Sequence, residues 1–282
     1  MPGRAARSAL AAAAIAALLA LPGCGSLSVQ EEQQLGAEMA RDARKHLDFV
    51  REQVVVGYVE QIGRGLVKAA GPQPFTYHFH VVEDPELNAF AAPAGYVYVN
   101  TGTILAAANA SELAGVIAHE VGHVALRHIA NNYNKQRGAG LLYQLGAVAA
   151  SIFVPGPGAA AAQLGGQLAA MGVLNSFSRQ AESEADAFAV KVMPVAGWNP
   201  EGLVSFFQTL QQQTKGGGHA PEFLSNHPAT ESRIEATSAL IREAKLPENL
   251  RESDGGKLEI IQRRIQILTG HARADATSGG TP

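Results

Sequence analysis

Apolar residues recur every three to four positions along most of this chain, as they do on the buried face of an amphipathic helix. The pattern predicts helices over residues 30–46 and 54–70 in the first half of the sequence. It predicts three more over residues 200–213, 230–244 and 258–268. Helices therefore dominate the predicted fold.

Two short segments follow a period of two instead. Residues 75–82 and the segment Gly95-Tyr96-Val97-Tyr98-Val99 alternate in the way that suits a pleated sheet, with aromatic and β-branched residues prominent. A short helix is expected over residues 101–108, directly after the second strand. We expect an α+β fold that is mainly helical, with a small sheet beside the helix that follows Asn109.

The helix after Asn109 carries the most informative motif in the chain. Asn109 offers a side-chain cap, and Glu112 follows three residues later, as in a capping box. Further along lies His119-Glu120-Val121-Gly122-His123, whose two histidines project from one helix face about one turn apart. That spacing lets both bind one metal ion, with Glu120 placed to take a proton from a metal-bound water.

The motif alone suggests a zinc hydrolase without establishing one. The same residues also occur as surface or core positions of ordinary amphipathic helices. His128 follows His123 by five residues, and on a continuous helix that rotation points it away from the metal. We expect His128 to be a surface or packing residue, so a third ligand must come from elsewhere.

A second acidic segment offers that ligand. Glu182 and Asp186 are four residues apart and share one face of an expected helix. Glu182 could reach the metal while Asp186 accepts a hydrogen bond from a ligand histidine. Glu184 would point to the opposite side, toward solvent. The alternative is that all three acids simply solvate an alanine-rich helix.

Four ordered motifs resemble those of the gluzincin zinc metallopeptidases of the CaaX prenyl protease, HtpX, BepA and LoiP type. HEVGH at 119–123 is followed by SRQAESEAD at 178–186, as in that family. NAFAAPAGYVYVNTG at 88–102 resembles the family's strand before the motif helix, and NHPATESRI at 226–234 its distal His-Pro and Arg element. The layout is most similar to the family's periplasmic lipoprotein peptidases, and the resemblance implies a zincin-like domain with a small sheet beside the HExxH helix. Four motifs in order are far more specific than one.

The resemblance implies one zinc ion per chain, bound by His119, His123 and Glu182. It implies Glu120 as general base and Asp186 as the partner that orients a ligand histidine. A zinc-bound water would then attack a peptide carbonyl, which is the reaction of a zinc endopeptidase.

The distal motif implies two further site residues. The resemblance places His227 near the active site, where in some relatives the matching histidine is an extra ligand that blocks the water site. It gives Arg233 the role of stabilising the oxyanion. Each has an alternative reading, because a lone His-Pro before a helix is more often turn chemistry and a lone Arg more often a surface charge.

The strand before the motif helix implies where a peptide would bind. The expected contacts are Asn88, Ala91, Gly95, Tyr96 and Val97. A strand over residues 95–99 at a sheet edge could pair with any extended peptide through its backbone. An interior strand with no ligand is the alternative, and the resemblance favours the edge. Relatives commonly have Pro-Gly-Gly where this chain has Pro93-Ala94-Gly95, a difference that bears on the turn geometry.

The N-terminus has the features of a bacterial lipoprotein signal. Arg4 and Arg7 precede an apolar run, and Leu21-Pro22-Gly23-Cys24 resembles a lipobox ending at the chain's single cysteine. We expect residues 1–23 to be a signal peptide, Cys24 to be lipidated, and 24–29 to be a linker. A plain secretory signal is the alternative. The residues after Cys24 lack the aspartate that favours inner-membrane retention in enterobacteria, so we expect the outer membrane, facing the periplasm.

Composition excludes some functions and structural features, and the remaining segments complete the predicted domain organisation. A formal charge of −3 offers no basic surface for nucleic acid, and a single cysteine excludes an internal disulfide. The apolar stretch 138–174 is expected to form two closely packed helices, with a membrane-touching or lid role as the alternative. We expect a peptidase domain over 30–250, a C-terminal helix over 251–270, a flexible connection at 216–218 and a flexible tail over 271–282.

Together these features predict a zinc-dependent endopeptidase of the bacterial cell envelope that hydrolyses unfolded or misassembled proteins. Its expected partners are those substrates, the membrane through lipidated Cys24, and envelope assembly machinery. The alternative is a latent protease that acts mainly as a chaperone or assembly scaffold for outer-membrane proteins. In that case His227 would occupy the open position of the zinc ion.

Overall fold

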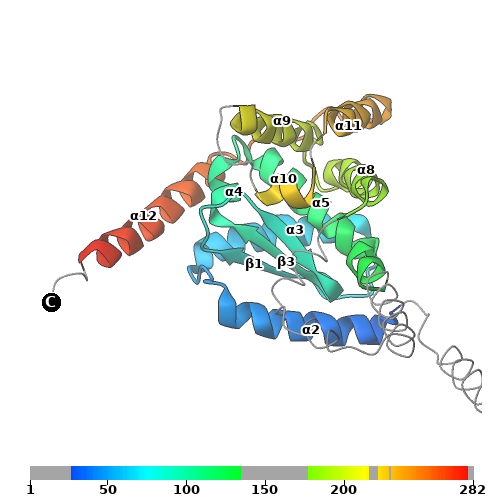
Figure 1. The fold of residues 1–282 in the computed structure, drawn as a ribbon. Helices are drawn as coiled ribbons and strands as arrows, with labels where there is room; N and C mark the ends of the chain where they lie inside the picture. The colour runs from blue at the N-terminus through cyan, green and yellow to red at the C-terminus, as the bar shows by residue number, and fades with distance from the viewer. Residues whose placement is uncertain (1–26, 135–176, 216–221, 229, 279–282) are drawn as a thin grey trace, which may run out of the picture.

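The computed structural model describes residues 27–134, 177–215, 222–228 and 230–278. Within them a small sheet lies among helices that make up most of the structure (Figure 1). The expected α+β architecture, with a sheet beside the motif helix, is confirmed. Among the described helices, none combines the length and the apolar character needed to cross a membrane.

In the described part of the chain, three strands form the sheet: β1 (His78–Val82), β2 (Ala89–Ala92) and β3 (Tyr96–Asn100). β3 lies between the other two, parallel to β1 and antiparallel to β2. Its backbone is therefore paired on both sides, and the expectation that residues 95–99 form an edge strand is wrong. β1 and β2 are the two edge strands instead. Alternation along a strand reports its two faces and does not specify which strands flank it.

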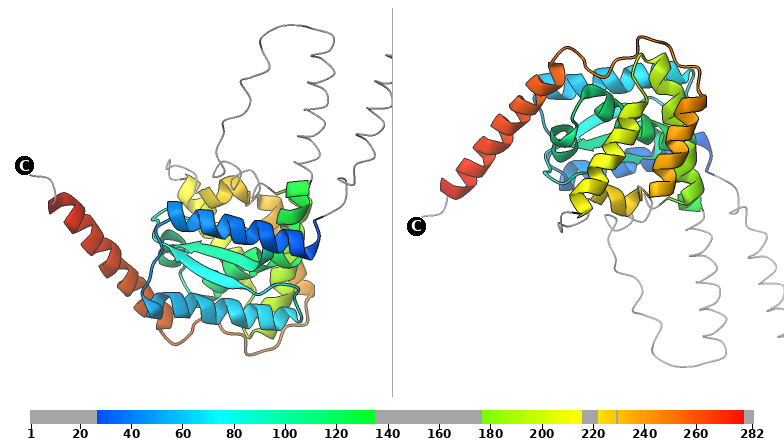
Figure 2. Two further views of the ribbon diagram at one scale, coloured as in Figure 1. Left: turned by 90° about the horizontal axis from the view of Figure 1, so that it is seen from below. Right: turned by 90° about the horizontal axis from the view of Figure 1, so that it is seen from above.

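Helices cover both faces of the sheet. α2 (Val29–His46) packs on one face, and α3 (Gln53–Ala70) and α5 (Ala110–Ala125) pack on the other (Figures 1 and 2). Along β3, Tyr98 packs with Ala43 of α2, whereas the residues on either side of Tyr98 join the main core. The period-two alternation in the sequence thus corresponds to a sheet that is buried on both sides.

α5 is the central helix of the fold. Every residue from Ala110 to Val124 is buried, and the helix packs against α3, β2, α8 (Arg179–Val195) and α9 (Glu201–Lys215). Its start is fixed by Asn109, whose side chain accepts a hydrogen bond from the backbone N–H of Glu112, as the capping pattern predicts. Polar side chains in a helix buried on all sides need partners or a function.

The other described elements are α4 (Thr101–Ala106), α10 (Glu222–Asn226), α11 (Glu231–Glu243), α12 (Lys257–Ser278) and a 3-10 helix, η1 (Pro93–Gly95). α12 projects from one side of the body (Figure 2). It begins at Lys257, later than the expected residue 251, and continues to Ser278 through a part of the chain expected to be a flexible tail. Helical periodicity beyond residue 270 is weak, so the sequence pattern underestimates the length of this helix.

Several expected segments lie outside the described residues: the signal peptide 1–23, Cys24, the apolar stretch 138–174 and the glycines at 216–218. The end of the expected linker 24–29 is described. Leu27 is buried, and Ser28 forms a capping box with Glu31, so α2 begins at Val29. Leu27, Ser28 and Val29, the last three residues of the expected linker, therefore belong to the folded domain.

The turn between β2 and β3 contains a left-handed residue. Ala94 has φ 62° and ψ 29°, a conformation that glycine adopts without the steric cost of a Cβ. The alanine that departs from the family's usual glycine therefore lies at a position of this turn where glycine would have no steric cost. α2 crosses the turn closely, since a Cβ on Gly36 would lie 2.2 Å from the carbonyl oxygen of Pro93.

Replacing Gly36 by Ala should destabilise the protein, because its Cβ would overlap backbone that cannot move independently of the sheet. We expect the free energy of unfolding to fall by about 1–3 kcal/mol. Gly57→Ala on α3 is the matched control, since a Cβ there meets nothing within 4 Å and should stabilise the helix by about 0.5–1 kcal/mol. Urea denaturation followed by circular dichroism measures both. Equal midpoints for the two variants would contradict the close packing of α2 on the turn.

Candidate metal centre

The central helix directs both motif histidines to one point. His119 and His123 are fully buried, and their Nε2 atoms lie 3.0 Å apart. Glu120 is also fully buried, and neither of its carboxylate oxygens has a hydrogen-bond partner among the described residues. The continuous burial of α5 thus places three ionisable groups where water does not solvate them.

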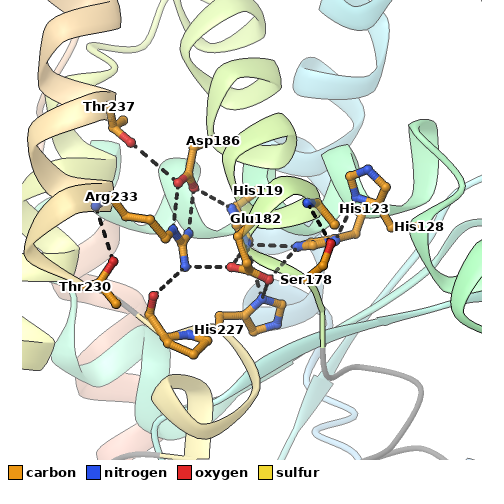
Figure 3. A network of polar contacts seen from close by, with 12 residues as sticks. His119, His123, His128, Ser178, Glu182, Asp186, His227, Thr230, Arg233 and Thr237 are labelled. Carbon is orange, nitrogen blue, oxygen red and sulfur yellow. Dashed lines mark hydrogen bonds and ion pairs between the residues drawn. The ribbon is translucent and has the colours of Figure 1, made fainter.

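Two further donors reach the same point from distant parts of the chain. Glu182 lies on α8, and His227 follows α10 (Figure 3). His227 Nδ1 is 2.9 Å from Glu182 Oε1 and 3.2 Å from His119 Nε2. Glu182 Oε1 lies 3.5 Å from His123 Nε2. The four ligand atoms of His119, His123, Glu182 and His227 all lie within 4.8 Å of one another.

This donor set fits a metal ion. Ring nitrogens that face each other with their lone pairs repel unless a proton or a cation lies between them. Three imidazoles and one carboxylate are nitrogen and oxygen donors of the kind that zinc prefers. The His-His-Glu-His cluster can therefore hold a metal ion, and the structure brings together all the ligands expected from the sequence, with His227 as an additional one.

A buried ion network supports the cluster from behind. His119 Nδ1 lies 2.9 Å from Asp186 Oδ1. Arg233 donates to both Asp186 oxygens, from Nε at 2.8 Å and from Nη2 at 2.7 Å. Its Nη1 lies 2.6 Å from Glu182 Oε2 and donates to the carbonyl oxygen of Pro228. Arg233 thus joins the two carboxylates of α8 to α11 and to the loop after His227 (Figure 3).

The buried environment separates the carboxyl groups by their pKa values. Burial raises the pKa of Glu120 above its ordinary value, although His227 and His119 act to lower it. Burial also acts to raise the pKa of Glu182, but His227 and His119 lower it overall. For His119, burial acts to lower the pKa, yet hydrogen bonds with Asp186 and Glu182 raise it to about 9. Glu182 therefore stays ionised, as a ligand must, while Glu120 accepts a proton more readily than Glu182.

His128 lies against the cluster, contrary to the expectation that it points away. α5 ends at Ala125, and Arg127 has φ 56° before helical residues resume at 128. The assumption of one continuous helix is therefore wrong. His128 Nδ1 lies 3.1 Å from Nδ1 of His123, and its Nε2 lies 3.0 Å from Glu184 Oε2. The Glu184 side chain is about half exposed, at 48%, so it faces solvent as expected while also contacting His128.

Phe177 is a contact residue that sequence reasoning missed. Its ring stacks on that of His123, with centroids 3.8 Å apart and an interplanar angle of 21°. It also lies 5.5 Å from the ring of His227. Phe177 directly precedes the cap residue of α8, outside the motif residues, and no local pattern marks it. Only the packing of α8 on α5 brings it to the cluster.

The residues expected to contact substrate lie in one hairpin beside α5. Ala91 is in β2 and pairs with Val97 of β3. Asn88 precedes β2, and its carbonyl oxygen accepts hydrogen bonds from Asn100 and Thr103. Tyr96 also lies in the interior strand, so of the expected set only Asn88 and Ala91 lie on a segment that forms an edge of the sheet.

Gly95, the remaining residue of that set, lies in η1 with φ 99°. A Cβ there would lie 2.4 Å from the carbonyl oxygen of Thr76. Both the backbone conformation and the close approach require glycine. Gly95 therefore has a structural role in the turn.

Comparison with known proteins agrees with the site. The model of Peptidase family M48 matches residues 55–241, which include the motif helix, α8 and the segment from His227 to Arg233. The chain belongs to this family. The resemblance inferred from the four sequence motifs is thereby confirmed.

Three relatives illustrate the similarity. The chain is 32% identical over 212 residues to the Beta-barrel assembly-enhancing protease of Escherichia coli (strain K12), covering 74% of this chain and 43% of the relative. It is 31% identical over 212 residues to the protein of the same name from Yersinia pestis, with the same coverage. It is 30% identical over 189 residues to the Mitochondrial metalloendopeptidase OMA1 of Schizosaccharomyces pombe, covering 67% of this chain and 54% of the relative. The chain thus spans less than half the length of the bacterial relatives that it matches.

Replacing Arg233 by Met should destabilise the metal-free protein, because Asp186 and Glu182 would lose their shared cation. We expect a loss of about 3–5 kcal/mol in the free energy of unfolding. Arg233→Lys should recover only part of it, since an ammonium cannot bind Asp186 through two parallel hydrogen bonds. Arg64→Met, which removes an exposed partner of Glu60 on α3, should change stability by less than about 1 kcal/mol. Denaturant unfolding with a chelator present compares all three. An Arg233→Met variant as stable as Arg64→Met would show that the buried network is not stabilising.

Proposed function

We propose that this protein is a zinc-dependent endopeptidase of the bacterial cell envelope that hydrolyses peptide bonds in unfolded or misassembled proteins. The observation that carries this proposal is the convergence of four buried donor atoms beside the buried Glu120 carboxylate, whose oxygens have no hydrogen-bond partner in the described part of the chain. A structural metal site needs no such free carboxylate, whereas hydrolysis needs a base at the reacting water.

The proposed ligands of one zinc ion are His119, His123 and Glu182. When bound, zinc supplies the Lewis acidity that makes water a nucleophile near neutral pH and polarises a peptide carbonyl. Glu120 removes the proton from the attacking water and passes it to the leaving amine. Its place between the two histidines on one helix, and its raised pKa, suit a group that gains and loses a proton in each turnover.

We assign Asp186 and Arg233 to positioning. Asp186 faces the far ring nitrogen of His119 and so orients that ligand. The resemblance implies that Arg233 stabilises the oxyanion, but its N–H groups face Asp186, Glu182 and the Pro228 carbonyl. A guanidinium held by these partners keeps two carboxylates in place.

The proposed peptide-binding element is β2, the edge strand beside α5. An extended substrate could pair with its backbone near Asn88 and Ala91, and such pairing is largely blind to sequence. Backbone pairing requires an unfolded or loop segment, which favours misassembled proteins as substrates. The names of the Escherichia coli and Yersinia pestis relatives, which refer to β-barrel assembly, support envelope proteins as the class.

The N-terminal sequence supports the proposed location. Residues 1–23 have the layout of a signal peptide, and Cys24 is the chain's only cysteine. We propose that Cys24 carries the lipid that attaches the protein to the outer membrane. The peptidase domain would then face the periplasm.

Replacing Glu120 by Gln should leave zinc binding intact and lower peptidase turnover by about 10²–10⁴-fold, because the base is lost while the ligands remain. Glu182→Ala should lose zinc as well as activity. Glu235→Gln, an exposed substitution on α11, should change neither. The measurement pairs cleavage of an unfolded protein with the zinc content of each purified variant. Full activity in Glu120→Gln would exclude the proposed mechanism.

A second function is supported by the position of His227. This residue is fully buried within the ligand cluster, and its Nε2 is 3.5 Å from Glu120 Oε1. A histidine that occupies the fourth position of zinc excludes the reacting water and keeps the enzyme latent. In this state the protein would hold a partner more often than it cuts one, as a chaperone or assembly scaffold for outer-membrane proteins. Displacement of His227 by a substrate would start proteolysis.

Replacing His227 by Ala should therefore raise the cleavage rate of an unfolded substrate, by roughly tenfold if the closed state is about 1.4 kcal/mol more stable than the open one. Zinc should remain bound through the other three ligands. His46→Ala, an exposed histidine on α2, serves as control and should leave the rate unchanged. A His227→Ala variant that retains zinc but cuts no faster than the parent would contradict latency.

A further inference from the structure

The two motif histidines have different partners on the side facing away from the cluster. Behind His119 lies the carboxylate of Asp186, which is bound by Arg233. Behind His123 lies the ring of another histidine, His128 (Figure 3). The carboxylate of Glu184 contacts the far nitrogen of that ring. Nothing in the HEVGH motif or in its mechanism accounts for this second chain of contacts.

We propose that His128 is a positioning residue for His123, and that Glu184 fixes the hydrogen-bonding direction of the pair. This inference rests on the proposed function, because it assigns a role toward the ligand cluster. In it, the Nδ1–H of His123 donates to Nδ1 of His128, and the Nε2–H of His128 donates to Glu184.

The direction follows from which atoms face the cluster. His123 Nε2 lies 3.0 Å from His119 Nε2 and 3.5 Å from Glu182 Oε1, so it is the nitrogen that points at the ligand position. A ligand nitrogen must be unprotonated, which leaves the proton of a neutral His123 ring on Nδ1. That proton needs an acceptor, and Nδ1 of His128 lies 3.1 Å away.

Glu184 allows only one direction for these hydrogen bonds. An ionised carboxylate accepts hydrogen bonds and cannot donate them. His128 Nε2, 3.0 Å from Glu184 Oε2, must therefore carry the proton, which leaves Nδ1 of the neutral His128 ring as an acceptor. Each hydrogen bond then has one donor and one acceptor, and His123 is held in the tautomer that a ligand requires.

The backbone after α5 is built to place His128 there. On a continuing helix, position 128 would rotate away from position 123. The left-handed conformation of Arg127, φ 56°, breaks the helix and turns the chain back. Arg127 Nε donates to Glu32 Oε2 at 2.7 Å, and the Glu32 side chain is 1% exposed. A second hydrogen bond from the guanidinium reaches the carbonyl of Leu27. α2 thus fixes a strained turn, which is typical of backbone held for a purpose.

His128 acts through His123 and is not itself one of the converging donors. Among the described residues, the ligand atoms that gather within 4.8 Å come from three other histidines and one glutamate: His119, His123, His227 and Glu182. Both ring nitrogens of His128 face partners elsewhere, Nδ1 toward the back of His123 and Nε2 toward Glu184. With 6% of its surface exposed, the ring is also shielded from competing water.

Three substitutions of His128 separate its two hydrogen bonds. In His128→Asn the amide oxygen lies where Nδ1 was and can still accept from His123. In His128→Gln the amide nitrogen lies near the position of Nε2 and can still donate to Glu184, but the acceptor for His123 is lost. His128→Phe retains the ring and loses both nitrogens.

The experiment measures zinc affinity of the purified full chain by competition with a chromophoric chelator. All variants are made in a Glu120→Gln background, so that the readout is independent of cleavage. We expect His128→Phe and His128→Gln to weaken zinc binding by about 10–100-fold, and His128→Asn to restore most of that loss. Glu184→Gln should weaken binding by less, because its amide oxygen still accepts, and Glu235→Gln on α11 is the matched control.

Histidine ¹⁵N NMR of the zinc-loaded protein provides a readout that a general packing role would not change. The Nδ1–H of His123 should be protected from solvent exchange in the parent and in His128→Asn, and exchange faster in His128→Gln. Circular dichroism of the zinc-free proteins identifies any variant that fails to fold. If the His128→Phe variant does not fold, the comparison of His128→Asn with His128→Gln still tests the proposal.

The outcomes also separate this inference from the proposed function. Zinc affinity that is equal in His128→Asn, His128→Gln and the parent would overturn the role of His128 and leave the peptidase intact. Equal losses in folded Asn and Gln variants would overturn it too, since the acceptor would then be irrelevant. A parent that binds no zinc would overturn the proposed function and this inference together.

Discussion

The compensation of buried charge is the constraint on which the rest of this structure depends. Glu182 and Asp186 are each 2% exposed, and an ionised carboxylate in such a place loses several kcal/mol of hydration. Arg233 and the surrounding histidines supply the opposite charge and the hydrogen bonds that make this burial tolerable. The fold must therefore bring α5, α8 and α11 together accurately, because a displaced partner would leave a charge unpaired.

Small residues on α5 make that accuracy attainable. A Cβ on Gly122 would lie 3.3 Å from the backbone of Ala185 and 3.1 Å from the ring of Phe188. Gly122, the fourth residue of the HEVGH motif, lets α8 approach the motif helix closely. Since Glu182 and Asp186 lie on this same helix, the close approach sets their distance to the histidines. Gly122 thus has a packing role within a motif whose other functional residues are proposed to bind metal or transfer protons.

The two sides of the cluster are fixed by different means. On one side, the ring of His119 contacts the buried carboxylate of Asp186, which in turn is bound by the guanidinium of Arg233. On the other side the contacts pass through His128 to a carboxylate that is 48% exposed. Water weakens charge interactions at such a surface. Buried ion pairs therefore hold the His119 side, whereas the contacts of the His123 side pass through one imidazole ring to a half-exposed carboxylate.

Sequence alone determined much of the helical architecture and the identity of the chemical groups. The capping pattern at Asn109, the spacing of His119 and His123, and the pairing of Glu182 with Asp186 are local features, and helical rotation converts them directly into positions on a face. Tertiary structure decided what depends on contacts between distant segments. β3 is interior because β1 pairs with its far side, Phe177 stacks on His123 because α8 packs there, and His128 faces His123 because Arg127 breaks the helix. Periodicity records which way a side chain points along one regular element, and it carries no information about where that element ends or what is packed against it.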